Sequence, residues 1–376
     1  NGIEVESIMF SHQFARNTDN LEILQALALS RRVDAQQQKV VNGLNPGDQT
    51  PLETTIGYEQ VAVDLTAWLA RHEPDPYLKQ ALDFALLEDF DHLYRYANLM
   101  DMLEGKKAEK IVKDLTEVMP GRPTTLEHRH PFDDIREPLK LGKNAPLSHL
   151  HALTVTAAEQ QTMNFYMNIG NRPTEPLARA LYLEIAQIEE QHVSHYESIL
   201  DPTMGWFENL VLHQYHECWM YYSFMQDEID PRVKQLYELH LNMEIEHLRV
   251  ACDMLRDIVG REPEELLPKS IENTICFKEN KAYVRKVLAE QIDLTAKDSE
   301  FVPVGQLPKD DRYFDYQAKV NGDWVPTEAV IEETIAAKGK EYRLETEGPN
   351  PVEGLRPADE RNGSSTEYAR IIGEAA

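Results

Sequence analysis

Glu189-Glu190-Gln191-His192 follows Glu159 by thirty residues, and this pairing is the strongest indication of the fold. The pattern occurs a hundred residues earlier, as Glu59 with Asp89-Phe90-Asp91-His92. A third copy, three residues shorter, is Glu217 with Glu244-Ile245-Glu246-His247. An acid and a histidine three positions apart project from the same face of a helix. Each copy therefore predicts a helical hairpin with an acid on its first helix and an acid–histidine pair on its second.

Turn signals support three such hairpins. Pro76, Pro173 and Pro231 each lie between two helical patterns, where proline commonly opens a helix. Strand signals are scarce, so the predicted class is all-α. The helical domain is expected over residues 51–260. Its expected parts are hairpins at 52–103, 149–200 and 205–259 and a proline-rich crossover at 104–148.

The flanking regions differ in composition from this domain. Residues 1–50 are expected to hold one helix, about 19–41, followed by a polar loop. Residues 261–376 are expected to form a long irregular C-terminal arm, because prolines and charges return there. Helices near 279–295 and 327–339 would interrupt the arm. From Glu345 onward the composition is typical of an extended or disordered tail.

Charge and cysteine content narrow the functional classes. The chain has 376 residues and a formal net charge of −27, which argues against nucleic acid and anionic membranes as partners. Three isolated cysteines indicate reduced thiols in a cytoplasmic location. No apolar run approaches the roughly 20 residues of a membrane span, and the first residues do not resemble a signal peptide.

The acids of the repeated pattern lie in mostly apolar helical stripes. Glu59, Glu159 and Glu217 each share a face with apolar neighbours three or four positions away. Burying an unpaired carboxylate costs several kcal/mol, so these side chains require a cation. A pair of metal ions would supply one.

A glutamate and a Glu-x-x-His, occurring twice in chain order on four helices, resembles the ferritin-like di-iron carboxylate superfamily. That superfamily includes rubrerythrins, bacterial di-iron oxygenases and manganese catalases. The resemblance covers residues 52–103 and 149–260 and implies a four-helix bundle, here extended by a third hairpin. It also implies that each metal takes one histidine and that carboxylates bridge the metals. The candidate ligands are Glu59, Asp89, His92, Glu159, Glu189, His192, Glu217, Glu244 and His247.

Two features depart from the family pattern. Asp89 stands where glutamate is usual, and Glu88 is a less well placed substitute. There are also three half-sites where one bundle needs two. Chain geometry favours hairpins one and two, whereas ligand identity favours hairpins two and three, in which every acid is glutamate. A site across a dimer, where the third hairpin meets a partner's, is the remaining alternative.

Chain geometry is the stronger of these arguments. In the superfamily the second and third helices run parallel, so a long crossover must join them. About 45 residues join hairpins one and two, which suffices. About five join hairpins two and three; they would reach roughly 17 Å where a parallel return needs roughly 28 Å.

The resemblance implies an oxidoreductase that activates O2 or peroxide at a carboxylate-bridged centre. Two iron ions per site are expected, because hard carboxylates and imidazole suit iron. A manganese catalase-like dismutation of peroxide is one alternative. A non-enzymatic iron-binding or helical scaffold protein is another, which metal content would distinguish. An electron-donor protein is a possible partner.

The arm contains more aromatic residues than a disordered tail would. These side chains are expected to dock on the helical body or on a neighbouring subunit, which predicts a homodimer or a higher homo-oligomer. They are Phe301, Tyr313, Phe314, Tyr316 and Trp324.

Overall fold

The computed structural model describes residues 1–271 and 273–357. Over these residues nearly all of the regular secondary structure is helical, which confirms the predicted class. Two short strands, β1 (Leu294–Lys297) and β2 (Glu300–Pro303), form an antiparallel hairpin that was not expected. No helix in the described ranges combines the length and the apolar character needed to cross a bilayer.

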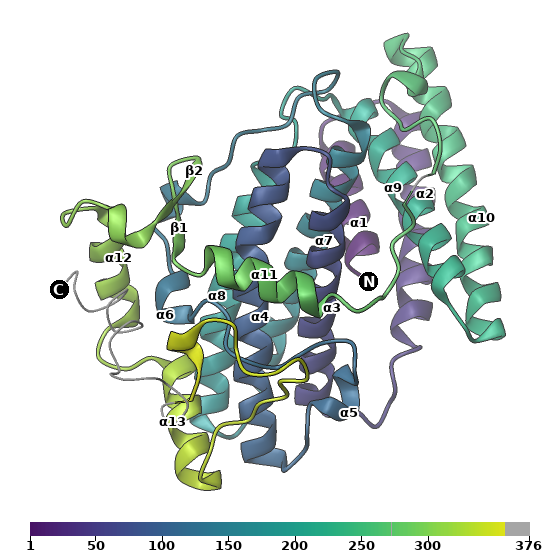
Figure 1. Cartoon of the computed structure of the whole chain (residues 1–376). Helices are drawn as coiled ribbons and strands as arrows, with labels where there is room; N and C mark the ends of the chain where they lie inside the picture. Colours follow the sequence, from purple (N-terminus) through teal and green to yellow (C-terminus); the bar gives the residue numbers. More distant parts are fainter. Residues whose placement is uncertain (272, 358–376) are drawn as a thin grey trace.

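Four long helices form the centre of the molecule (Figure 1). They are α3 (Pro51–His72), α4 (Pro76–Glu104), α7 (Pro146–Ile169) and α8 (Pro176–Glu197). Each opens with proline, whose fixed φ suits the first helical turn. Thr50 and Glu53 form a capping box on α3, and Asp75 caps α4. These local signals explain why the expected limits of both hairpins agree with the observed helices to within a few residues.

The two hairpins pack side by side, with α3 against α7 and α4 against α8. Thr55, near the start of α3, bonds to Tyr182, near the start of α8, at 2.7 Å. The Tyr96 and Tyr166 rings, near the ends of α4 and α7, lie 5.2 Å apart. Helices α4 and α7 therefore run in the same direction, and a long connection must return the chain to the start of α7. That connection carries α5 (Glu109–Val112), α6 (Thr124–Glu127) and a 3-10 turn at Pro131–Asp133.

A second group of four helices lies beside the first (Figure 1). It consists of α1 (Gly2–Arg16), α2 (Leu21–Asn42), α9 (Trp206–Asp227) and α10 (Pro231–Met254), which continues as a π-helical turn at Leu255–Val259. Helix α1 packs on both α7 and α9. A Cβ at Gly2 would lie 2.6 Å from the Ala157 carbonyl oxygen, so only glycine permits this approach.

The expectation of a single helix in residues 1–50 was wrong. Helix α2 agrees with the predicted 19–41, but α1 was missed. The buried face of α1 includes Glu4, Ser7 and Ser11 among its apolar residues, so the sequence lacks a clear apolar stripe.

The chain after residue 260 is more ordered than an irregular arm. It forms α11 (Lys281–Gln291), α12 (Arg312–Asn321) and α13 (Pro326–Lys338), of which α12 was not predicted. Short 3-10 turns occur at Pro263–Glu265, Val304–Gln306 and Glu353–Leu355. Leu344 pairs with Val118 of the crossover, and Asn350 is fully buried. The expected tail from Glu345 is therefore packed as far as 357, and its remainder, 358–376, lies outside the described residues.

Phe301 and Tyr313 of the arm pack on the helical body. The Phe301 ring lies 4.8 Å from that of Phe84 on α4. Tyr313 is buried, and its hydroxyl donates to the Leu126 carbonyl oxygen at 3.1 Å. Trp324, by contrast, is 57 % exposed. Part of the arm's aromatic content thus serves packing within the chain.

Candidate metal centre

Six of the nine candidate ligands converge between the four central helices. No one of them is more than 1 % exposed. Helix α3 supplies Glu59, α4 supplies Asp89 and His92, α7 supplies Glu159, and α8 supplies Glu189 and His192. The thirty-residue spacing brings the acid of the first helix and the acid–histidine pair of the second helix to the same level of the hairpin.

The six side chains form two overlapping groups of donor atoms. Within each group the donor atoms lie within 4.8 Å of one another. One group is Glu59, His92 and Glu189; the other is Asp89, Glu159, Glu189 and His192. Glu189 belongs to both, and each group has its own histidine. The described groups could therefore hold a metal ion each, with one shared carboxylate.

Several buried donor atoms of the two groups make no hydrogen bond, although contacts of 3.3–3.6 Å join His192 Nδ1 to three of the carboxylates. Within the described part of the chain, six buried atoms of the two groups have no hydrogen-bond partner. They are Glu59 Oε2, both carboxylate oxygens of Asp89, Glu159 Oε2, Glu189 Oε2 and His192 Nδ1. Buried acceptors without partners are strongly unfavourable. Burial raises the pKa of Glu59 and of Glu159 well above the usual range, so a bound cation would relieve a large penalty.

Both histidines are aimed at the cluster by a carboxylate on their far side. His92 Nδ1 lies 3.1 Å from Glu189 Oε1, whereas its Nε2 lies 3.0 Å from Glu127 Oε2. His192 Nδ1 lies 3.3 Å from Glu189 Oε2, and its Nε2 lies 2.8 Å from Glu88 Oε2. A carboxylate behind a metal-binding histidine fixes its tautomer and increases its basicity.

Glu88 is therefore not a substitute for Asp89. Its carboxylate faces away from the cluster and is held by Arg129 at 2.7 Å and Arg122 at 3.3 Å. Although burial alone would raise it, these arginines and His192 hold the pKa of Glu88 well below its usual range. Glu88 stays ionised and can keep accepting a hydrogen bond from His192.

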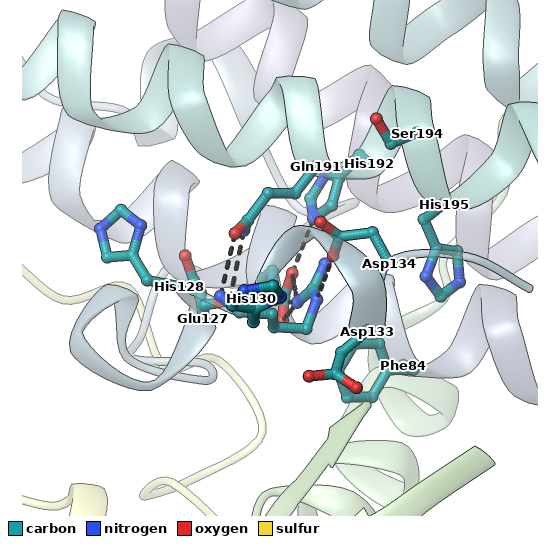
Figure 2. A network of polar contacts seen from close by, with 12 residues as sticks. Phe84, Glu127, His128, His130, Asp133, Asp134, Gln191, His192, Ser194 and His195 are labelled. Carbon is teal, nitrogen blue, oxygen red and sulfur yellow. Dashed lines mark hydrogen bonds and ion pairs between the residues drawn. The ribbon is translucent and has the colours of Figure 1, made fainter. Parts of the chain in front are cut away.

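The crossover supplies the other supporting carboxylate, Glu127, which the sequence reasoning missed. Figure 2 shows Gln191 and His192 of α8 above the loop that carries Glu127 and His128. Gln191 accepts from the Arg129 backbone N–H at 2.9 Å and donates to the Glu127 carbonyl oxygen at 3.2 Å. A carboxylate in a proline-rich crossover carries no periodic signal. Its position depends on how the loop folds back onto α8.

In the metal-free cluster, the carboxylates and the histidines shift one another's pKa values. Burial alone would raise the pKa of Glu189, but His192 and His92 lower it to about 2. Burial would lower the pKa of His92, yet Glu127 and Glu189 raise it well above its usual range. Without metal, the histidines thus carry protons that partly offset the carboxylates. Metal binding would displace those protons.

The third half-site does not join this cluster. Glu217 lies on α9, and Glu244 and His247 lie on α10. Helix α9 packs on α1 as well as on α7, and His247 of α10 lies 3.4 Å from Asp34 of α2. In the part of the chain that the structure describes, the alternative that paired hairpins two and three is therefore not found. Instead, Glu217 is grouped with Glu4 and Asp34, while Glu244 and His247 are grouped with Asp34.

Several histidines near the predicted ligands have structural contacts. His128, His149 and His151 are all buried. His151 Nδ1 lies 2.6 Å from Glu73 Oε2. His195 is fully buried, with its ring 6.1 Å from that of Phe84, and His216 bonds to Thr154 at 2.8 Å.

Comparisons with protein-family models, curated proteins and solved structures found no match to this chain. Fold and donor geometry alone therefore define the protein: it is all-helical, with a buried carboxylate–histidine cluster that could hold metal.

Proposed function

We propose that the protein is a ferritin-like di-iron oxidoreductase that activates O2 or peroxide between α3, α4, α7 and α8. The observation that carries this proposal is the membership of Glu189 in both donor groups. A carboxylate shared between two groups, each with its own histidine, is the arrangement that a carboxylate-bridged metal pair requires.

The donor set favours iron and also suits manganese. It contains four carboxylates and two imidazoles, and such hard and borderline ligands bind Fe²⁺ and Mn²⁺. When bound, a pair of iron ions would supply the electrons for reduction of O2 or peroxide. With manganese in the same ligands, catalase-like dismutation of peroxide is the second candidate.

The residues of the chain have separate tasks in this proposal. Glu59 and Glu159 would each bind one metal from opposite hairpins, and Asp89, neither of whose oxygens makes a hydrogen bond, could bridge beside Glu189. The Tyr166 hydroxyl donates to Glu59 Oε1 and leaves Oε2 of the same carboxylate available. Glu127 and Glu88 would fix the orientation of His92 and His192 by accepting a hydrogen bond from each ring.

Burial of the cluster limits what can reach it. Because the six ligand side chains are almost completely enclosed, O2 and hydrogen peroxide fit as reactants better than a large organic molecule. An electron-donor protein would then have to act from the surface, through the surrounding helices.

Elemental analysis of protein purified from its native source tests this function. Two irons per chain at the central cluster, together with O2 consumption by the reduced protein, would support the oxidase or oxygenase. Manganese with rapid peroxide dismutation would favour the catalase-like alternative. Protein that contains no transition metal and binds none after reconstitution would refute both, and would favour a helical scaffold.

A further inference from the structure

A second buried cluster lies between α1, α2, α9 and α10. It contains Glu4 of α1, Asp34 of α2, Glu217 of α9, and Glu244 and His247 of α10. The four acids are at most 1 % exposed. Their donor atoms form two groups, Asp34 with Glu244 and His247, and Glu4 with Asp34 and Glu217, each within 4.8 Å.

The spacing of this cluster repeats that of the central one. Glu4 precedes Asp34 by thirty residues, as Glu59 precedes Asp89 and Glu159 precedes Glu189. Helices α1 and α2 are therefore a fourth copy of the hairpin. Gln37 stands three residues after Asp34, where the other copies have histidine, and this substitution hid the pattern in the sequence.

The two clusters also share contacts around the ligands. The Tyr221 hydroxyl donates to Glu4 Oε1, as the Tyr166 hydroxyl does to Glu59 Oε1. His247 Nδ1 faces inward, 3.0 Å from Glu244 Oε2 and 3.4 Å from Asp34 Oδ1. Asp34 is the common member of both groups, the position that Glu189 holds in the central cluster.

Unpaired buried atoms indicate that this cluster is built for a ligand. Among the described residues, five of its oxygens have no hydrogen-bond partner: Glu4 Oε2, both oxygens of Asp34, Glu217 Oε1 and Glu244 Oε1. The same holds for Oε1 of the buried Gln37. Four buried acids face a single histidine. A cation between the two helical pairs would satisfy these atoms together.

We infer that this cluster is a second metal site, which binds one divalent transition metal through Asp34, Glu244 and His247. Glu4 and Glu217 form an all-oxygen subsite beside it. Because Gln37 replaces the second histidine, this subsite has no nitrogen donor and binds transition metals more weakly. The chain thus pairs a symmetric two-histidine centre with an asymmetric one-histidine centre.

A surface groove gives this site a route for metal exchange. The groove has a volume of about 600 Å³, lies between α2, α9 and α10, and includes His247 and Gln214 in its wall. His247 is 12 % exposed at its side chain, whereas His92 and His192 are fully enclosed. We therefore expect the second site to exchange its metal faster than the central one.

Titration of the metal-free full-length protein with Co²⁺ tests the inference. Binding is followed by visible absorption and counted by elemental analysis after dialysis. Wild-type protein should bind three equivalents. His247→Gln and Glu244→Gln should each bind one fewer, and His192→Ala should keep the one equivalent of the second site. Glu246→Gln is the matched control, because Glu246 is exposed on the same helix and pairs with Arg249.

Each outcome separates this inference from the proposed function. If His247→Gln and Glu244→Gln bind as much Co²⁺ as wild type, the second site is refuted while the central centre stands. If only His192→Ala is without effect, the central centre fails and the second site stands. Circular dichroism should show both glutamine variants folded, because each removes a buried ionisable group.

A gain-of-binding variant gives an independent measurement. Gln37→His restores the missing histidine at a buried position, so it should add one Co²⁺ equivalent at the second site. Gln36→His is the control, since Gln36 is exposed and its Oε1 accepts from Lys39. Equal stoichiometry in Gln37→His and Gln36→His would contradict the repeat on which the inference rests.

Discussion

Glu189 and His192 are the residues on which the proposed centre depends most. Glu189 contacts both donor groups, and His192 lies within 3.6 Å of Asp89, Glu159 and Glu189 oxygens. Each substitution removes a ligand from a buried cluster and leaves the remaining carboxylates unbalanced. We therefore expect Glu189→Ala and His192→Ala each to lose most of the iron from the central site.

The control for this prediction is Glu190→Ala on the same helix. Glu190 is exposed and accepts from Ser194 at 3.0 Å, so this variant should retain wild-type iron. The measurement is iron per chain after identical purification. Unchanged iron in both ligand variants would refute the proposed metal centre.

Glu127 is a positioning residue for His92 rather than a ligand. Its Oε2 lies 3.0 Å from His92 Nε2, opposite the nitrogen that faces Glu189. Loss of such a supporting carboxylate typically lowers metal affinity about 10–100-fold. Glu127→Ala should show this loss in a competition titration against a chelator, and Glu127→Gln should recover part of it, because its carbonyl oxygen still accepts from Nε2–H. Equal affinities for the alanine variant and wild type would show that Glu127 does not orient the ligand.

At the scale of helices, chain connectivity decides which half-sites meet. The crossover between α4 and α7 is long enough to bring Glu59 and Glu159 to one level, whereas the short link from α8 to α9 leads into a different helical group. Glu59→Ala should therefore lower iron at the central centre, and Glu217→Ala should not. The spectroscopic signature of the iron pair provides the readout. A centre that persists in Glu59→Ala and disappears in Glu217→Ala would mean that the connectivity argument was wrong.

The same scale explains what the sequence could predict. Acid–histidine spacing and helix-opening prolines predicted α3, α4 and α7–α10, and six residues of the central cluster followed from them. Three features were missed: α1, Glu127 and the role of Glu88. Helix α1 was missed because its buried face is partly polar. The position of Glu127 depends on how a loop folds, and the role of Glu88 depends on arginines distant in sequence. Periodicity reports on contacts within a helix, whereas these features arise from contacts between distant segments.

At the scale of the whole molecule, the C-terminal region supports the loop that carries Glu127. Tyr313 donates to the carbonyl oxygen of Leu126, and Gln317 on the same helix donates to that of His128, on either side of Glu127. Phe301 and Tyr313 are already used within the chain, so a homo-oligomer formed by the arm would have to use exposed aromatics such as Trp324. The C-terminal region thus holds the loop that carries Glu127, and Glu127 in turn orients His92.

Tyr313→Ala in the full-length protein tests this link. Removal of a buried aromatic side chain costs about 3–5 kcal/mol in stability, and here it also releases the loop beside Glu127. We expect a lower melting temperature together with weaker iron binding, while Tyr313→Phe, which loses one hydrogen bond worth about 1 kcal/mol, should lie close to wild type. Trp324→Ala is the control, because its exposed ring should affect neither property, although sedimentation would show whether it holds an oligomer together. If Tyr313→Ala is destabilised but binds iron with unchanged affinity, then the arm stabilises the fold without positioning the ligands.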